Sequence, residues 1–285
     1  MQLQHNNYIA NSAHNVHSFD GEDGILEKIL SLIPQSELTQ WCVEFGAWDG
    51  HHLSNTRYHI EQKQYSAILI EGSAVKHKVL AANYAHNTNV YPINAYVGYN
   101  AADNLDHILA TTPIPLEYDY VSIDIDGNDY HVWEHCTKYT PKVVCIEYNP
   151  TIPNEVSYIQ PKDFALQKGN SLLALYNLGI SKGYYMVAVS KWNAFFVLEN
   201  YKHLYSIAIN HPVVMNLNNP YITHFYYGFD GEVMLSGNTN FTWHNVAIKA
   251  KHLQVLPRPF RVFPYSMGKW KWKVFRVYAK LKGLI

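Results

Sequence analysis

The sequence predicts a doubly wound α/β protein with a Rossmann-like sheet, and three observations support this. Short apolar segments rich in Val, Ile and Tyr recur through the first half of the chain. The stretches between them, roughly 15 to 25 residues each, are long enough for crossover helices. The pattern then changes to a helix followed by two adjacent strand-like segments. Repeated strand–helix alternation favours a parallel sheet with right-handed crossovers.

The predicted strands are short and almost continuously apolar, as in a sheet that helices cover on both faces. They span residues 41–45, 66–71, 88–97, 118–126 and 142–148.

The first predicted helices have recognisable ends. An N-terminal helix covers 21–33 and ends at Pro34. A second helix begins at Ser73, and a third begins near Asn128, a residue type that favours the N-cap position.

The later part of the domain is predicted as a helix and a β-hairpin. The helix covers 170–183, with Asn170 as its cap and Gly183 as its stop. Residues 184–190 and 193–198 follow as two strands. This hairpin is expected to close the sheet with antiparallel strands.

Composition limits the classes of protein. The chain has 285 residues, 48% of them hydrophobic, which suffices for one large core or one domain with an appendage. Three cysteines are too few for a disulfide framework, and Cys42 and Cys145 lie in apolar runs. We therefore expect buried thiols and a reducing, cytoplasmic compartment. We also expect neither a signal peptide nor a membrane span, because the first twenty residues are polar and no apolar run approaches about 18 residues.

The net charge of -1 hides a strong asymmetry. Residues 1–232 hold all 23 acidic side chains and 12 of the 22 basic ones. Residues 233–285 hold the other 10 basic side chains and no acid. Such a division predicts a basic tail that meets an anionic partner or its own acidic domain.

Ligands of open α/β sheets bind at the carboxyl ends of the strands. The first predicted strand ends in "VEFGAWDG", where Gly46 and Gly50 let the backbone and a helix N-terminus approach a ligand. Trp48 replaces the middle glycine of the dinucleotide fingerprint, so a ligand without phosphates fits better. A tight strand–helix turn without a ligand is the alternative.

Glu71 ends the second predicted strand. A carboxylate there can accept hydrogen bonds from both hydroxyls of a ribose. A solvated acid at a strand end is the alternative.

Oxygen-bearing side chains gather where the fourth and fifth predicted strands end: Asp124, Asp126, Glu147 and Asn149. Such a set suits a hard cation such as Mg²⁺ or Ca²⁺. The spacing does not match an EF-hand, because Asp129 stands where that loop needs glycine. Alternatively, Asp126 or Asp129 caps the helix near Asn128.

Four histidines lie near these strand ends: His51, His52, His131 and His135. Each could act as a general base, since imidazole titrates near neutrality. Solvated surface histidines are the alternative in a chain with sixteen of them.

Six motifs occur in one order: "GEDGILEKI", "CVEFGAWDGHHLSNT", "LIEGS", "DYVSIDIDGNDYHVW", "VVCIEYNP" and "GYYMVAVSKWNAFFV". Together they resemble the FkbM-like branch of the class I methyltransferases that use S-adenosylmethionine. The resemblance covers residues 18–199. It implies a seven-stranded sheet with an antiparallel last strand.

The resemblance also implies a cofactor site. It places Glu44, Gly46, Ala47, Asp49 and Gly50 under the methionine part, Ser54, Asn55 and Thr56 beside its carboxylate, Glu71 and Gly72 at the ribose, and Asn94 and Ala95 near the adenine.

For catalysis, the resemblance places Asp124 and Asp126 beside the methyl group and the acceptor, with His131 as a further candidate. Asp126, Glu147 and Asn149 are the implied ligands of a divalent cation such as Mg²⁺. The implied reaction is in-line transfer to a sugar hydroxyl of a glycan, polysaccharide or glycolipid, in which the site positions and deprotonates that hydroxyl.

Two other functions remain open at this stage. A glycosyltransferase could use Asp124 and Asp126 as a D-x-D motif for a metal and a nucleotide sugar, although Glu71 would then be unexplained. A non-catalytic binding module could also have this fold.

We expect the chain to divide into a methyltransferase domain (1–200), an aromatic-rich extension or lid (201–248) and a basic amphipathic tail (249–285). On a helix, one face of the tail carries Trp270, Val274, Val277, Tyr278, Leu281 and Ile285, and its flank carries Lys269, Lys273, Arg276 and Lys280. Such a helix can lie on an anionic membrane surface, here through residues 269–285. Its first residues also alternate like a strand, and packing on the acidic domain is an alternative. No nucleic acid partner is expected, because no recognised module is present.

Overall fold

The computed structural model describes residues 6–285. The chain forms two compact units, Met1–Asn219 and Pro220–Ile285. The predicted roles of residues 1–200 as a methyltransferase domain, 201–248 as an extension or lid and 249–285 as a basic tail remain predictions.

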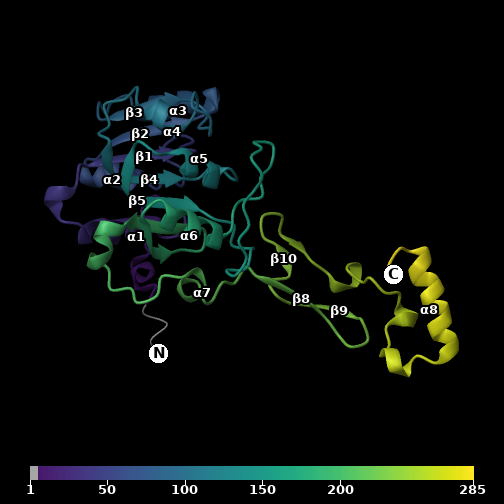
Figure 1. The fold of residues 1–285 in the computed structure, drawn as a ribbon. Coiled ribbons are helices and arrows are strands. Elements are labelled where there is room, and N and C mark those ends of the chain that lie inside the picture. The colour runs from purple at the N-terminus through teal and green to yellow at the C-terminus, as the bar shows by residue number, and fades with distance from the viewer. Residues whose placement is uncertain (1–5) are drawn as a thin grey trace. The chain divides into compact units, whose positions relative to one another are not determined.

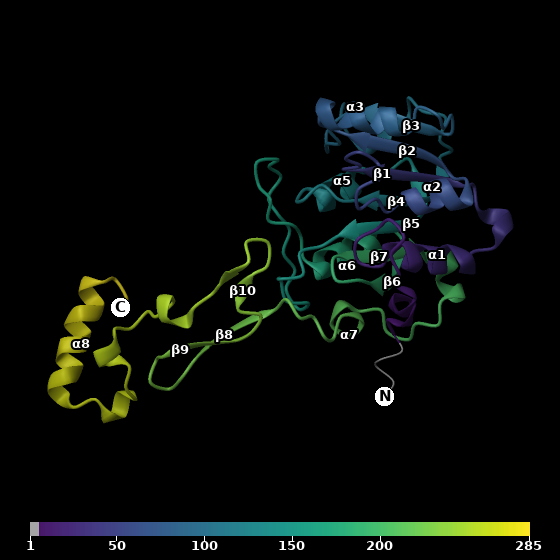
Figure 2. The same ribbon diagram turned by 180° about the vertical axis from the view of Figure 1, so that it is seen from behind.

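A seven-stranded sheet forms the centre of the first unit, in the order β3-β2-β1-β4-β5-β7-β6 (Figure 1). Its strands are β1 (Trp41–Phe45), β2 (Ser66–Glu71), β3 (Val90–Asn94), β4 (Glu117–Ile123), β5 (Thr140–Glu147), β6 (Tyr184–Val189) and β7 (Asn193–Leu198). β1 to β5 pair in parallel, whereas β7 is antiparallel to both β5 and β6. Figure 2 shows β7 between β5 and β6. The predicted Rossmann-like sheet with an antiparallel last strand is confirmed.

Burial explains why these segments form strands. The residues of β5 from Val143 to Ile146 are fully buried, as is most of β6 and β7. Side chains of successive residues point to opposite faces of a sheet, so both faces are covered here. The three cysteines are free and buried, as predicted for Cys42 and Cys145.

The helices of the first unit are α1 (Glu22–Leu32), α2 (Arg57–Lys63), α3 (Ala74–Asn83), α4 (Leu105–Leu109), α5 (Asp129–His135), α6 (Leu172–Ser181) and α7 (Pro212–Met215), with 3₁₀ turns at Tyr8–Ser12, Gln35–Glu37 and Glu199–Leu204. Ser73, where this helix was predicted to begin, caps α3 by accepting a hydrogen bond from the Lys76 amide.

The predicted cap of α6 is wrong. Ser171 caps this helix, because its hydroxyl accepts from the amide of Ala174. The side chain of Asn170 instead bridges two loops, donating to the Gly127 carbonyl and accepting from the Gln160 amide.

The second unit contains two small antiparallel pairs and a C-terminal helix. β8 (Thr223–Tyr227) pairs with β9 (Val233–Gly237), and β10 (Asn240–Phe241) pairs with β11 (Val246–Ala247). Short 3₁₀ turns at Ala250–His252, Arg258–Phe260 and Pro264–Ser266 lead to α8 (Lys269–Leu281). Residues 269–281 are therefore helical, and the strand alternative for this stretch is excluded. In the part of the chain that the structure describes, no helix has both the length and the apolar character needed to cross a bilayer.

Candidate functional site

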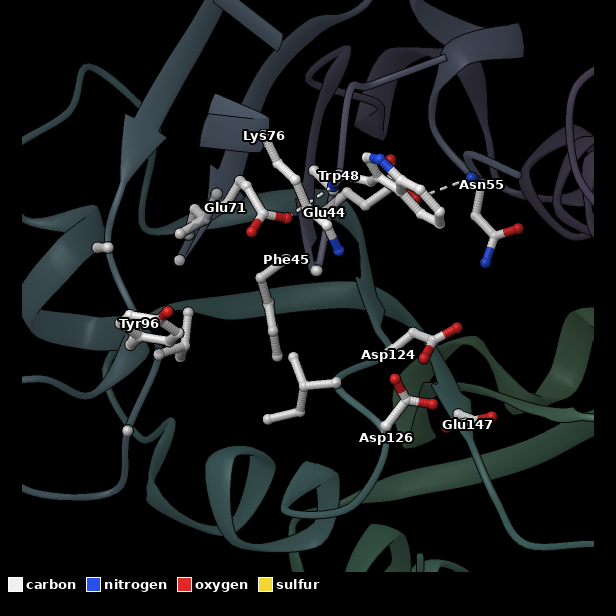
Figure 3. Close-up of a pocket in the computed structure, with 18 of the residues that line it drawn as sticks. Glu44, Phe45, Trp48, Asn55, Glu71, Lys76, Tyr96, Asp124, Asp126 and Glu147 are labelled. Atoms are coloured by element: carbon white, nitrogen blue, oxygen red, sulfur yellow. Dashed lines mark hydrogen bonds between the residues drawn. The ribbon is translucent and has the colours of Figure 1, made fainter. Parts of the chain in front are cut away.

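A pocket of about 740 Å³ opens at the carboxyl ends of β1, β2 and β4 (Figure 3). This size is typical of sites for small molecules and cofactors. Among the residues predicted for the cofactor, the metal or catalysis, the following line it: Glu44, Gly46, Ala47, His52, Asn55, Glu71, Gly72, Ala95, Asp124, Asp126 and Glu147.

The turn after β1 passes close to the end of β4. Gly46 has a left-handed φ of 77°, and a Cβ atom there would collide with the carbonyl oxygen of Asp124. Glycine is therefore required on both counts. The same turn brings the Trp48 amide to Glu71, which links the ends of β1 and β2.

Glu44 stabilises the loop that leads to α2. Its Oε2 accepts hydrogen bonds from the hydroxyls of Ser54 and Thr56, both at 2.6 Å, and its Oε1 accepts from the Asn55 amide at 2.9 Å. Burial raises the pKa of Glu44, and these three hydrogen bonds oppose that shift. The hydrogen bonds among Glu44, Ser54 and Thr56 thus fix the loop and position Asn55. The Asn55 side chain donates to Ser122 at 3.0 Å and lines the pocket.

Glu71 is the acid at the end of β2. Its Oε2 accepts from the Trp48 amide at 2.9 Å, and its Oε1 accepts from the Ser73 amide at 2.7 Å. A carboxylate oxygen has two lone pairs, so each can accept another hydrogen bond from a ligand hydroxyl. Asn94 does not line the pocket. Its amide donates to the carbonyls of Glu71 and Gly72 and ties β3 to β2.

Three acids converge on the opposite side of the pocket (Figure 3). Asp124 and Asp126 follow β4, Glu147 ends β5, and one oxygen of each lies within 4.8 Å of the others. Asp124 and Asp126 are exposed to the pocket, and Glu147 is half-buried. Desolvation by the surrounding protein, followed by the charges of Asp129 and Asp126, raises the pKa of Asp124 to about 7. Burial and the charge of Asp124 hold the pKa of Glu147 well above its usual range.

Asp129 fixes the turn between β4 and α5. Its two oxygens accept from the amides of Ile125 and Gly127, each at 2.9 Å. Burial raises its pKa to about 6, against the effect of these hydrogen bonds. The turn also holds Asp126 in the left-handed region, with φ 58°. Asn128 occupies the N-cap position of α5, but its side chain makes no capping bond.

Two predicted site residues lie apart from the acids. His131 is buried, its Nε2 is 2.7 Å from the Gln160 carbonyl oxygen, and it does not line the pocket. The amide of Asn149 donates to the Lys168 carbonyl, and its oxygen accepts twice from Thr151. Both side chains thus support the long loop that follows β5.

Asp49 and Gly50 belong to the turn after β1 but do not line the pocket. Asp49 accepts from the amides of His51 and His52. Gly50 lies against the side chains of Leu80 and Tyr84.

Several aromatic and basic side chains at the pocket were not predicted. Tyr96 and Phe164 line it, and the Phe164 ring stacks on Tyr99 with centroids 5.1 Å apart. The Lys76 ammonium lies 4.4 Å from the centroid of the Trp48 ring. Only Tyr96, which lies at the end of the third predicted strand and next to Ala95, could have been indicated from the sequence.

Chemically, the pocket combines two capabilities. A carboxylate whose pKa lies near 7 can take a proton from a bound hydroxyl at neutral pH. A group of carboxylate oxygens also attracts cationic ligands and hard metal ions.

No protein-family model matches this sequence, and no curated protein matches it. Solved structures of several methyltransferases show a distant likeness. A protein from Galdieria sulphuraria described as a sarcosine dimethylglycine methyltransferase is 13% identical over 58% of this chain and 62% of its own, with a TM-score of 0.39. A SAM dependent methyltransferase from Aquifex aeolicus is 10% identical over 60% of this chain and 87% of its own, with a TM-score of 0.37.

The CMeT domain of the citrinin polyketide synthase is 12% identical over 62% of this chain, with a TM-score of 0.40, and half of that chain is covered. This protein thus spans less than two thirds of the first of these neighbours and half of the last. At such low identity, a function for this chain has to rest on its own site residues.

Proposed function

We propose that this protein is an S-adenosylmethionine-dependent O-methyltransferase of the FkbM-like type, acting on a sugar hydroxyl of a glycan, polysaccharide or glycolipid. One observation carries the proposal. A single pocket joins the turn after β1 and Glu71, the two expected cofactor elements, to an acid whose pKa is raised to about 7. The sheet also has the antiparallel β7 that the sequence resemblance implies.

The residues present suit the cofactor. Glu71 retains lone pairs for the two hydroxyls of a ribose. The turn at Gly46 brings backbone rather than a side chain to the pocket, and Ala95 and Tyr96 offer an apolar edge beside Glu71. Asp124, Asp126 and Glu147 make the opposite side acidic, which suits a cationic sulfonium.

Bound S-adenosylmethionine would supply an electrophilic methyl group. Asp124 would accept the proton of the acceptor hydroxyl, and the pocket would hold that hydroxyl in line with the methyl group. Alternatively, Asp124, Asp126 and Glu147 would together hold a divalent cation, which would itself lower the pKa of the hydroxyl in place of a general base. The resemblance to the FkbM-like branch supports a sugar acceptor. Exposed Trp48 and Phe164 add flat apolar surfaces against which a sugar ring can pack.

The first test is whether the protein binds the cofactor product. Thermal unfolding is measured with S-adenosylhomocysteine, in the presence of either Mg²⁺ or EDTA. A ligand at about 100 times its Kd adds roughly 2.7 kcal/mol. For a chain of this size the midpoint should rise by several degrees, at roughly 2 to 4 °C per kcal/mol. Glu71→Gln should reduce this rise, since a ribose diol would lose an anionic acceptor.

UDP- and GDP-sugars serve as controls in the same scan. A rise with S-adenosylhomocysteine alone supports the proposal, and transfer of labelled methyl groups to a glycan panel then identifies the acceptor. A rise only with a nucleotide sugar and metal contradicts it, because Asp124 and Asp126 would then act as a D-x-D motif.

A further inference from the structure

Helix α8 carries an apolar stripe that its own unit leaves largely exposed. Trp270, Val274, Val277 and Leu281 recur every three or four residues and therefore share one face of the helix. They are 78%, 39%, 60% and 82% exposed. We refer to these four residues as the α8 stripe.

A different face of α8 anchors the helix. The rings of Phe275 and Tyr278 lie 5.5 and 5.3 Å from Phe260, and Ala279 is fully buried. Tyr278, which the sequence placed on the outer apolar face, thus belongs to the inner one. Because these contacts already hold the helix in place, the exposure of the α8 stripe is not the result of a detached tail.

One edge of the α8 stripe is basic. Lys269, Lys273, Arg276 and Lys280 are exposed and share one side of the helix, between the stripe and the inner face. No acid follows residue 232 in the sequence, and Glu232 itself lies 3.9 Å from Arg261. The positive charges of Lys269, Lys273, Arg276 and Lys280 are therefore largely unneutralised by acids of the same unit.

A second apolar feature lies in the same unit. Phe229 and Tyr265 are more than 90% exposed, and Phe263 lies between them, 6.4 Å from one ring and 5.6 Å from the other. This aromatic cluster joins the turn between β8 and β9 to the segment just before α8.

We propose that the unit Pro220–Ile285 docks on the surface of an anionic lipid bilayer through the α8 stripe and its basic edge, with the aromatic cluster as a second contact. A bilayer surface accepts apolar side chains at the acyl boundary and attracts Lys and Arg to its headgroups. Exposed Trp and Tyr side chains suit this interface. A second copy of the chain is a poorer occupant, because it would bring two uncompensated basic edges together. The proposal is independent of the chemistry in the pocket.

Flotation of the full-length protein with vesicles tests the proposal. Binding is expected to vesicles of phosphatidylcholine mixed with phosphatidylglycerol and not to phosphatidylcholine alone. Raising the salt from about 0.1 M to about 1 M should weaken binding, since the Debye length falls from about 10 to about 3 Å. Leu281→Asp should abolish binding. Lys273→Gln combined with Lys280→Gln should weaken it roughly 30-fold, at roughly fivefold per charge.

Val75→Asp is the matched control. Val75 is a 76% exposed apolar residue on a helix of the other unit, so the same change there should leave vesicle binding as in the wild type. Unchanged melting temperatures would show that the variants fold. Equal binding to neutral vesicles, or undiminished binding by Leu281→Asp, would overturn the proposal. A wild-type dimer that Leu281→Asp converts to monomers, without any vesicle binding, would assign the α8 stripe to a second copy instead.

Discussion

Asp124 is the residue on which both the proposed chemistry and part of the pH response depend. Its carboxyl group faces the pocket beside Asp126 and Glu147, and its pKa is raised to about 7. A group with this pKa is about half deprotonated at neutral pH, which suits a general base.

Methyl transfer should therefore rise with pH through about 7 and then level off. Asp124→Asn should lower kcat at least about 100-fold, the usual contribution of general-base catalysis. The measurement is a pH–rate profile with labelled S-adenosylmethionine. Asp163→Asn, an exposed acid in the loop after β5, is the control and should keep the wild-type profile. A pH-independent rate in the wild type would rule out this role for Asp124.

Asp124 should also make stability depend on pH. Its pKa is about 7 in the folded protein but about 4 in an unfolded chain, so between these values the folded state binds more protons. The free energy of unfolding should thus fall as pH rises from about 4 to about 7. Allowing for contact with pocket water, the effect is on the order of 1 kcal/mol.

Asp124→Asn should remove that penalty. We expect it to melt roughly 2 to 4 °C above the wild type at pH 8 and close to it near pH 4, as measured by calorimetry. Asp230→Asn, in the other unit, should show no such difference between the two pH values. If the melting temperature of Asp124→Asn rose equally at pH 4 and pH 8, the gain would come from packing rather than from removal of the charge.

At this scale the sequence predicted the convergence of Asp124, Asp126 and Glu147, because they follow strands that were themselves predictable. The roles of His131 and Asn149 were not predictable in the same way. Their partners, the carbonyls of Gln160 and Lys168, lie 29 and 19 residues away in an irregular loop. Hydrogen bonds between residues so far apart in the sequence cannot be predicted from local sequence patterns.

Among the structural elements, the connection from β1 to α2 matters most to the site. It contains Gly46, which approaches β4, and Thr56, which binds Glu44. Both contacts hold this connection in a single conformation.

Gly46→Ala should be strongly destabilising and should abolish the response to S-adenosylhomocysteine. Its Cβ atom meets the Asp124 carbonyl, so the ends of β1 and β4 must separate. Gly183→Ala is a matched control with φ 79° and no neighbour within 4 Å of the added atom. It should cost only about 1 kcal/mol of backbone strain and keep ligand binding. Equal losses of unfolding free energy in Gly46→Ala and Gly183→Ala, measured in urea, would show that backbone strain alone requires glycine at position 46.

Thr56→Val should cost about 1.5 to 3 kcal/mol, since it removes a hydrogen bond to a buried carboxylate while keeping the shape of the side chain. Thr111→Val removes a hydroxyl that donates only to a neighbouring helical carbonyl and should cost less than about 1 kcal/mol. Chemical denaturation of both variants measures the difference. Similar losses of unfolding free energy in the two variants would mean that the hydrogen bond from Thr56 to Glu44 adds no special stability.

Element prediction succeeded where one pattern dominated and failed where two neighbours competed. The start of α3 was predicted at Ser73, one residue before the observed start at Ala74, because no other capping side chain adjoins it there. Asn170 and Ser171 both favour a cap, and the choice between them depends on tertiary hydrogen bonds of Asn170. The ends of β3 and β4 were placed too far along the chain, because apolar residues continue beyond them: Ala95, Tyr96 and Val97 after β3, and Ile125 after β4.

For the whole molecule, the chain divides after Asn219, and all ten basic side chains of residues 233–285 lie in the second unit. Residues 201–219 belong by contact to the first unit. Tyr205 donates to the carbonyl of Ile29, and Asn216 donates to the Tyr148 hydroxyl. Such long-range contacts cannot be inferred from aromatic-rich composition.

Limited proteolysis should cut near the boundary between Asn219 and Pro220 and leave a core fragment with all seven strands. The main sheet lies entirely in Met1–Asn219, so the fragment should melt within a few degrees of the intact protein. Mass spectrometry of a digestion time course identifies the cut. Early cleavage between β5 and β6, without any stable fragment ending near residue 219, would contradict the division.

The position of β7 has a consequence for how the chain folds during synthesis. β7 pairs with β5 on one side and β6 on the other, yet it is the last of the seven strands to leave the ribosome. Until residues 193–198 emerge, β5 has an open edge and β6 has no neighbour in the main sheet. Exposed strand edges favour aggregation, so nascent chains ending before residue 193 are the species most in need of a chaperone.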